Sequence, residues 1–535
     1  MMGTQQSEAQ LFSYAVNLEK RVRASHPLRQ VKSAIDFSFV REEVAHCYGR
    51  KGNESVPPEV ILKMMFLLFF DDIKSERELM ELIGERLDYL WFLDYGLDEK
   101  VPDHSVLSKA RVRWGKQVFE SLFVRTVSQC VEAGLVNGSK LHVDASLIDA
   151  DASRDSVIKS SPELIAALKR AYSATESKLE ISTTPESYQS VNDRMMSQSD
   201  PDAACVRKGG AESRPRYHHH RAVDDYRGVI TAVETTPGSI AENKKLLDLI
   251  NQHEKNTRCQ VQTVVADHKY GTHENYVACQ ERGIETHMGE VTRHTANTGR
   301  KEGIFGDEVF RYDAAANIYR CPAGQILKPR RVHPIRRTLE YKASAKICGG
   351  CALRTQCTRS AHGRTVQRHE KQEALNKART QARSQAARRD RKRRQHLMEK
   401  SFADATNNHH FKRARWRRLW RQQIQDYLIA AMQNVRILLA NQNPKYSVAA
   451  ALLAPAMPSE SFLYPLYRSI DGLNWKFATL LRSNRSTSLT TSPLAMPFKP
   501  TNSNHLGNRP FLDPNPLMPS NICEKTTATA SPRGA

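Results

Sequence analysis

The sequence lacks an apolar run long enough to cross a bilayer. Its longest such run, VILKMMFLLFF at residues 60–70, contains Lys63 and is about half of the roughly 20 residues that a spanning helix needs. The first residues, MMGTQQSEAQLF, lack a basic segment followed by an apolar core, so no secretory signal is expected. We therefore expect a cytoplasmic protein that has no membrane partner.

Acidic residues are in short supply relative to basic ones. The 535 residues include 58 Asp and Glu against 80 Lys and Arg, which gives a formal net charge of +22. This excess favours a polyanionic partner, with nucleic acid ahead of an anionic membrane. The alternative is a basic protein that has no such partner.

Cysteine is present but does not indicate a disulfide scaffold. Ten cysteines in a cytosolic chain of this length are expected to be reduced thiols or metal ligands. The length itself allows about three or four domains.

Helical patterns dominate residues 14–135. PPEVILKMMFLLFF at 57–70 starts with proline at a first-turn position, and Leu79, Leu82, Ile83, Leu87 and Leu90 continue a helical period after it. Asp103 and Ser105 cap a third, basic helix. The module is interpreted either as a DNA reader of the helix-turn-helix kind or as a bundle that supports the next domain.

Strands and helices alternate over residues 139–288. The predicted order is strand, strand, strand, helix, strand, helix, strand, with a turn at Tyr226–Gly228 and a helix capped by Ser239. The polar, serine-rich segment 154–215 is predicted to be a partly helical insertion or a linker.

Three carboxylates fall at informative places in this pattern. Asp144 lies inside the apolar strand of SKLHVDASLIDADAS, and Asp267 ends the buried strand of VVADHKYGT. An unpaired carboxylate in a buried strand costs several kcal/mol or becomes protonated. Two such acids on neighbouring strands suit a shared divalent cation, Mg²⁺ or Mn²⁺. Glu399, on a later predicted helix with its side chain toward the sheet, is the third candidate for a two-metal site. Taken singly, each acid is more typical of a surface or capping residue, but all three in this strand–strand–helix order are much less expected by chance.

The amino-acid sequence of several segments resembles that of the transposases of bacterial insertion sequences. The resemblance covers about residues 15–445 and is carried by these segments: VPDHSVLSKAR, VDASLIDADAS, YHHHRAVDDYRGVITAVETTPGSIAEN, VVADHKYGTHENY and MEKSFADATNNHHFKRARWRRLWRQQIQDYLIAAMQNVRIL.

The resemblance implies an α/β RNase H-like catalytic core of the DDE, retroviral-integrase-like type. It implies a catalytic triad of Asp144, Asp267 and Glu399, all three binding Mg²⁺, with Mn²⁺ as a substitute. The implied reaction is metal-dependent cleavage of double-stranded DNA at terminal inverted repeats and 3′-OH transfer to target DNA. The resemblance also implies that the protein acts as a homodimer in the synaptic complex and is associated with the nucleoid.

The sequence departs from this pattern near Glu399. Relatives often carry Arg four residues before the glutamate and Lys seven residues after it, where this chain has Gln395 and Thr406. Arg394 and Lys400 lie close enough in sequence to substitute in part. These departures support the alternative of a catalytically decayed or repurposed transposase that still binds DNA.

The chain is densely basic over residues 361–421, where a helix gains from neutralising phosphates. The DNA-binding candidates are Arg393, Arg394, Lys400, Lys412, Arg413 and Arg415. Trp416 and Trp420 are predicted to pack rather than to stack on bases. His218–His220 are interpreted as a strand segment rather than a metal patch.

Cys321, Cys348, Cys351 and Cys357 fall in a turn-rich segment whose Cys-x₂-Cys pair is typical of a structural zinc site. Reduced thiols in a small β insertion are the alternative, and a zinc-binding nucleic-acid adaptor is a third hypothesis for the function. The other six cysteines show no ligand spacing.

The predicted organisation is a helical DNA-binding domain at 1–135, the first part of the core at 136–288, a β-rich insertion at 289–368, the basic and C-terminal helices of the core at 369–443, and a disordered, low-complexity tail at 444–535.

Overall fold

The computed structural model describes residues 16–49, 53–176, 194–207, 209–210, 212–289 and 303–442. The chain divides into two units, Met1–Ala454 and Pro455–Ala535, and every described residue belongs to the first. The predicted low-complexity tail at 444–535 therefore lies outside the described residues. None of the helices in the described ranges is both long and apolar enough to cross a membrane.

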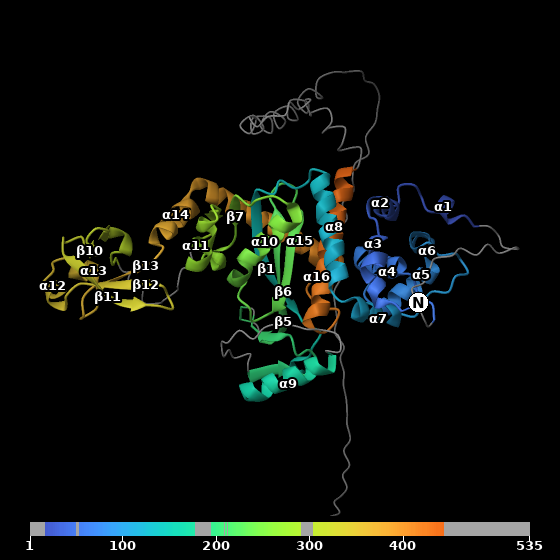
Figure 1. Ribbon diagram of the computed structural model, residues 1–535, viewed down its shortest axis with the longest axis horizontal. Helices are drawn as coiled ribbons and strands as arrows, with labels where there is room; N and C mark the ends of the chain where they lie inside the picture. Colours follow the sequence, from blue (N-terminus) through green and yellow to red (C-terminus); the bar gives the residue numbers. More distant parts are fainter. Residues whose placement is uncertain are drawn as a thin grey trace, which may run out of the picture. The chain divides into compact units, whose positions relative to one another are not determined.

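The N-terminal region is helical, as predicted (Figure 1). Its helices are α1 (Leu18–Arg21), α2 (Pro27–Ala34), α3 (Phe39–Val44), α4 (Pro58–Phe70), α5 (Glu76–Glu85), α6 (Leu87–Leu93), α7 (Ser105–Trp114) and α8 (Gln117–Glu132), with a short 3₁₀ turn, η1 (Ala45–Cys47).

The apolar run at 60–70 is a buried helix rather than a membrane span. Helix α4 starts with Pro58, whose missing N–H costs nothing at a first-turn position, and nearly all of its residues are buried. The helical pattern that follows is interrupted at Arg86, which has extended backbone and binds Asp88 through its guanidinium. The structure therefore has two helices, α5 and α6, where the apolar spacing of the sequence continues without a break.

The long strands and helices of the core follow one another along the chain as predicted, and the structure shows how the strands pair. Strand β1 (Lys140–Asp149) is antiparallel to β5 (Arg214–Asp224) and parallel to β7 (Thr263–Val265), which in turn is parallel to β8 (Glu285–His287). Strands β6 (Ile230–Pro237) and β4 (Ala204–Val206) both pair with β5. This mixed sheet confirms the predicted RNase H-like core.

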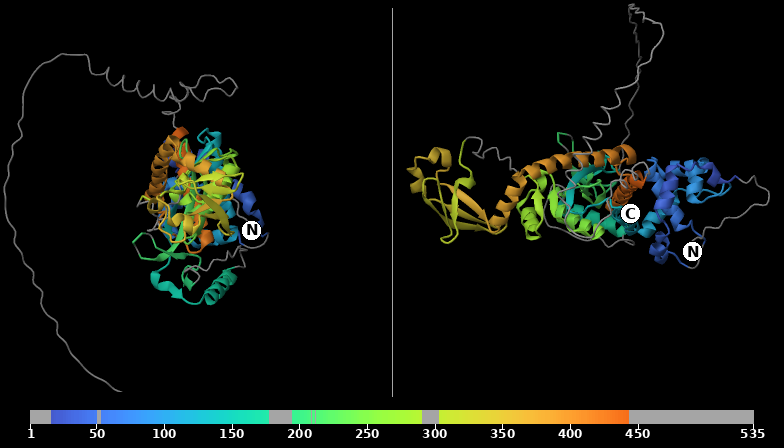
Figure 2. Two further views of the ribbon diagram at one scale, coloured as in Figure 1. Left: turned by 90° about the vertical axis from the view of Figure 1, so that its left-hand side faces the viewer. Right: turned by 90° about the horizontal axis from the view of Figure 1, so that it is seen from above.

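Helices cover both faces of the sheet. Leu141 and Val143 of β1 pack with α10 (Leu246–Thr257), α11 (His273–Glu281) and α14 (Gln372–Arg383) in one apolar cluster. On the other face, α15 (Gln385–His409) and α16 (Leu419–Gln442) share a second cluster with the N-terminal helices. Helix α15, orange in Figure 2, is one continuous helix.

The polar segment after β1 is more ordered than an unstructured linker. It contains η2 (Arg154–Ser156), β2 (Val157–Lys159), α9 (Pro162–Glu176), β3 (Met195–Ser197) and then β4, with β2 and β3 paired. The prediction of a helix capped by Ser239 is wrong at its start. A 3₁₀ turn, η4 (Glu242–Lys245), comes first, because Glu242 and Lys245 are held by ion pairs to Lys269 and Glu234.

The β-rich insertion forms a separate antiparallel sheet in the order β13-β12-β11-β10-β9 (Figure 1). Its strands are β9 (Arg311–Asp313), β10 (Ile318–Arg320), β11 (Ile326–His333), β12 (Thr338–Lys342) and β13 (Thr365–His369), with the short helices α12 (Ala345–Gly349) and α13 (Arg354–Cys357) between the last two. Its buried apolar residues are few: Phe310, Tyr319, Leu327, Tyr341, Ala343 and Val366.

A buried polar network ties the sheet to α15 and α16. Arg221 of β5 is 0% exposed, and its Nη1 donates to Ser401 Oγ of α15 at 2.8 Å and to Gln433 Oε1 of α16 at 3.0 Å. Arg221 Nε donates to His219 Nε2 at 2.9 Å, and His219 Nδ1 lies 2.9 Å from Asp426 Oδ2. Because Nε2 accepts a hydrogen bond, Nδ1 carries the proton and His219 is neutral.

This network predicts a specific acid sensitivity. Burial lowers the pKa of His219 to about 4, while an unfolded histidine titrates near 6.5. As pH falls from 6.5 towards 4, the unfolded chain takes up a proton that the folded chain does not, so stability falls. At pH 5 this linkage removes about 2 kcal/mol. In urea unfolding at pH 7 and pH 5, His219→Gln should show a smaller loss than the wild type.

His409 serves as an internal comparison for this measurement. Burial also lowers its pKa to about 4, so His219→Gln should keep the part of the pH dependence that comes from His409. Equal pH dependence of the wild type and His219→Gln would contradict a neutral, buried His219.

Candidate active site

Asp144 and Asp267 lie at matching positions of two adjacent parallel strands. The last paired residues of β1 and β7 are His142 and Val265, and each aspartate follows two residues later. Their side chains are 26% and 23% exposed, so both are half-buried but open to solvent. The parallel register therefore brings the two carboxylates next to each other where β7 ends, with Asp144 in the middle of β1, which stays paired with β5 as far as Asp149.

Arg394 is the cation beside Asp144. Its Nη1 donates to Asp144 Oδ2 at 2.7 Å, and the backbone N–H of Ala145 donates to the other carboxylate oxygen at 2.9 Å. Burial nevertheless raises the pKa of Asp144, and Glu242 adds to the rise, while Arg394 opposes it. The carboxylate is thus short of compensating positive charge.

A third acid at this site, Glu242 of η4, was not predicted. It accepts a hydrogen bond from Lys269 Nζ at 2.8 Å, two residues after Asp267, and its side chain is 13% exposed. Burial acts to raise the pKa of Glu242, but donation from His218 and Lys269 outweighs it and the pKa is lowered. The one sequence signal for it was an acid soon after the carboxyl end of a strand, β6.

Tyr270 completes the surroundings of these acids. It is fully buried in η5 (His268–Tyr270), and its hydroxyl has no hydrogen-bond partner within the described ranges. Burial raises the pKa of Tyr270, and Glu242, Asp144 and Asp267 add to the rise. An orphaned hydroxyl beside several carboxylates indicates a place built for a further polar group.

Glu399 does not point at the sheet, so that expectation was wrong. Its side chain is exposed and accepts a hydrogen bond from Gln395 Nε2 at 3.1 Å. Arg394 instead occupies the face of α15 that meets β1, together with the buried Met398 and Ala405. Five residues along an α-helix rotate a side chain by about 140°, which places Glu399 on the open face.

The two positions that depart from the family pattern serve the helix itself. Gln395 binds Glu399, and Thr406 Oγ1 donates to the carbonyl of Phe402 at 2.7 Å. Lys400 is exposed. Arg394, suggested as a partial substitute for the missing arginine, is the residue that reaches Asp144.

The predicted DNA-binding cations differ in availability. Arg393 binds Asp225 through Nε at 2.6 Å, and Arg413 is 75% exposed and lies 3.7 Å from Asp151. Lys412 donates to Ser146. Arg415 is 9% exposed, lies over the ring of Phe69 and donates to backbone carbonyls, which is a structural role.

The aromatic and histidine predictions are confirmed. Trp416 packs against Phe69 and carries Arg111 over its ring, and Trp420 is packed on the same apolar cluster. His218, His219 and His220 are buried residues of strand β5.

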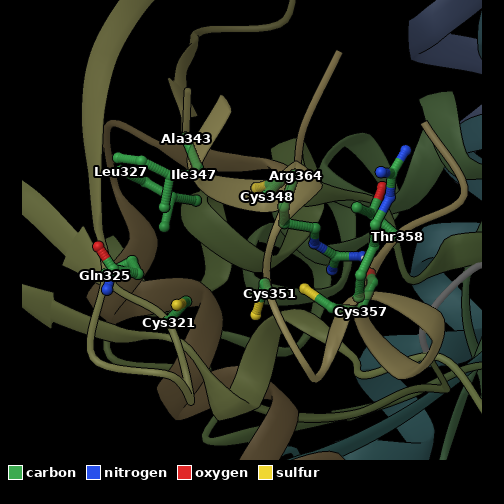
Figure 3. A pocket seen from close by; sticks show the side chains of 11 residues that line it. Cys321, Gln325, Leu327, Ala343, Ile347, Cys348, Cys351, Cys357, Thr358 and Arg364 are labelled. Atoms are coloured by element: carbon green, nitrogen blue, oxygen red, sulfur yellow. The ribbon is translucent and has the colours of Figure 1, made fainter. Parts of the chain in front are cut away.

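The four cysteines predicted as zinc ligands line a pocket in the insertion (Figure 3). Among the described residues, no group of three or more His, Cys, Asp or Glu side chains is placed to hold a metal as it stands.

The pair of aspartates fits a divalent cation, whereas Glu399, the third predicted ligand, does not lie beside the pair. Two carboxylates at matching positions of neighbouring strands, both open to solvent, are suitable ligands for Mg²⁺ or Mn²⁺. The Tyr270 hydroxyl and the buried Nε of Arg394, which lack hydrogen-bond partners within the described ranges, belong to the same cluster of side chains.

Two family models match the chain. One, described as a transposase domain (DUF772), covers residues 16–113, and the other, described as a transposase DDE domain, covers residues 320–439. The first match spans the N-terminal helices into α7, and the second spans the insertion and α14 to α16, including Glu399. No curated protein matches the chain.

Solved transposase structures also align. A piggyBac transposase synaptic complex with hairpin DNA has 8% identity and a TM-score of 0.28, covering 81% of this chain and 82% of that one. A Mos1 transposase paired-end complex has 10% identity and a TM-score of 0.14, covering 44% and 61%. A Mos1 mariner paired-end complex with Mn has 11% identity and a TM-score of 0.14, covering 50% and 73%.

The two family matches lie on either side of the central sheet along the chain. The helical match precedes the RNase H-like sheet, and the DDE match follows it along the chain. By these observations, the chain carries a DUF772 transposase domain in its helical N-terminal region and a transposase DDE domain over residues 320–439.

Proposed function

We propose that this protein binds insertion-sequence ends and catalyses metal-dependent DNA strand cleavage followed by 3′-OH strand transfer. The observation that carries the proposal is the matching position of Asp144 and Asp267 on adjacent parallel strands, beside the carboxyl end of β7, where ligands bind in such sheets. The substrates are double-stranded DNA with terminal inverted repeats and target DNA. The expected setting is the nucleoid in the cytoplasm, with a homodimer in the synaptic complex.

Asp144, Asp267 and Glu399 are the proposed ligands of Mg²⁺, with Mn²⁺ as a substitute. When bound, such ions stabilise the attacking and leaving oxygens of an in-line displacement at phosphorus. Asp144 is held by Arg394 and Ala145, and Asp267 caps η5 by accepting from the backbone of Lys269. Glu399 reaches the pair only if α15 changes its rotation or position.

Arg394 has a second proposed task. A guanidinium that donates to Asp144 in the free protein is available to a DNA phosphate once a cation compensates the carboxylate. Its neighbours Arg388, Arg389, Lys392 and Lys400 are exposed on the same helix. These cations, together with Glu399, form the open face of α15 on which the DNA would lie.

A pocket at the junction of α14 and α15 supports DNA binding there. It is lined by four arginines, Arg379, Arg383, Arg388 and Arg391, beside Tyr276. Like charges gathered in one pocket repel each other, and a phosphate group offsets this repulsion.

The alternative is a decayed or repurposed transposase that binds DNA without cutting it. It is favoured by the exposed position of Glu399 and by Gln395 and Thr406 at the departing positions. Strand cleavage separates the two functions, because only the first needs the carboxylates.

The cleavage prediction tests the triad. Asp144→Asn, Asp267→Asn and Glu399→Gln should each lower nicking of a labelled transposon-end duplex on the order of 10³-fold or more, because the groups act as a unit. DNA binding should persist. Asp155→Asn, an exposed carboxylate after β1, is the control and should cut normally. Near wild-type cleavage by any triad variant would remove that residue from the site.

A second prediction concerns competition for Asp144. Arg394→Gln should tighten Mn²⁺ binding, measured by titration, by about tenfold, since a cation no longer competes for the carboxylate. Arg393→Gln is a matched control, with the same charge change one residue away and its ion pair at Asp225. Asp144→Asn should weaken Mn²⁺ binding. Equal effects of the two arginine variants would contradict the competition.

A third prediction concerns the open face of α15. Replacing Arg388, Arg389 and Lys392 together by Gln should weaken duplex binding, and the slope of log affinity against log salt should fall by about 0.9 for each phosphate that is no longer neutralised. A triple variant with the wild-type slope would place the DNA elsewhere. Lys377→Gln, an exposed cation on α14, provides the single-charge reference.

A further inference from the structure

The four cysteines of the insertion converge although they are far apart in sequence. Cys321 follows β10, Cys348 lies in α12, Cys351 lies in the turn after it, and Cys357 ends α13. All four line one pocket, together with Leu327, Ala343 and Ile347 (Figure 3). Cys321 and Cys357 have no second cysteine at the tight spacing of a zinc finger. The fold nevertheless brings both to the same pocket as Cys348 and Cys351.

Tight backbone turns fix the loops that carry these thiols. The N–H of Cys321 donates to the carbonyl of Gln325 at 2.9 Å, and Gly324, with φ +74°, returns a bond to the carbonyl of Cys321 at 2.8 Å. Gly363 has φ +88°, and a Cβ there would lie 2.8 Å from the carbonyl oxygen of Ala343 and 3.4 Å from Cys348 Sγ. The backbone therefore approaches the pocket closely from two sides.

The insertion has little else to hold it together. Its apolar core has six buried residues, and most side chains of β11 are exposed. Small sheets with such cores usually need a disulfide, a metal or another cross-link. All four thiols are free, so no disulfide supplies that cross-link.

We propose that Cys321, Cys348, Cys351 and Cys357 bind one Zn²⁺ as a closed, tetrahedral, structural centre of the insertion. Closed four-thiolate sites with no open position are typical of structural zinc. As they lie, the sulfurs do not form a coordination shell, so binding includes rotation of cysteine side chains about single bonds, which costs little. The proposal is independent of the proposed DNA chemistry.

Metal content of the purified full-length chain is the first measurement. About one zinc per chain is expected, lost in Cys348→Ser and in Cys351→Ser and kept in Cys205→Ser, a half-buried cysteine of β4 outside the pocket. No metal in the folded wild type, iron instead of zinc, or zinc retained by all three variants would overturn the proposal.

Thiol reactivity keeps the test informative if a serine variant fails to fold. In the wild type, alkylation followed by peptide mapping should find these four cysteines protected, and a zinc chelator should expose them together while Cys205 keeps its reactivity. Replacement of zinc by Co²⁺ should give thiolate-to-cobalt absorption. Independent alkylation of the four thiols without chelator, or a disulfide between any two of them, would contradict a shared metal.

Discussion

The buried guanidinium of Arg221 is the interaction on which the arrangement of the core depends. A charge that is 0% exposed is costly unless its surroundings supply opposite charge and hydrogen bonds. Here His219 accepts from it and lies beside the equally buried Asp426, while Ser401 and Gln433 accept from Nη1. Since these partners come from one strand and two helices, the hydrogen bonds of Nε and Nη1 form only when sheet, α15 and α16 are assembled together, and Nη2 has no partner among the described residues.

This constraint also sets which side of α15 meets the active-site edge. Ser401 lies seven residues after Arg394, so both occupy about the same face of the helix. With Ser401 held by Arg221, which is the cross-strand partner of Asp144, Arg394 falls against Asp144 and Glu399 falls on the exposed face. The same network that stabilises the core therefore holds the proposed third carboxylate away from the other two.

The N-terminal helices and the insertion are built in different ways. Phe69 of α4 packs on Trp416, and His409 binds the carbonyl of Phe69, so the N-terminal helices share their apolar cluster with the helices of the core. The helices of the transposase domain at 16–113 are thus packed in part by residues near the other end of the described chain. The insertion has its own small core and its own cysteines, and its stability is set locally.

The sequence by itself determined the element order, the helical N-terminal region and the placement of the two aspartates on strands, because periodicity and turn residues are local. It also indicated that Trp416 packs and that the cysteines belong together. Only the tertiary structure decided that Glu242 joins the acids, that Arg415 is structural and that Glu399 faces outwards. These depend on helix rotation and ion pairs between distant segments, such as Arg394 with Asp144, 250 residues apart, which no local pattern encodes.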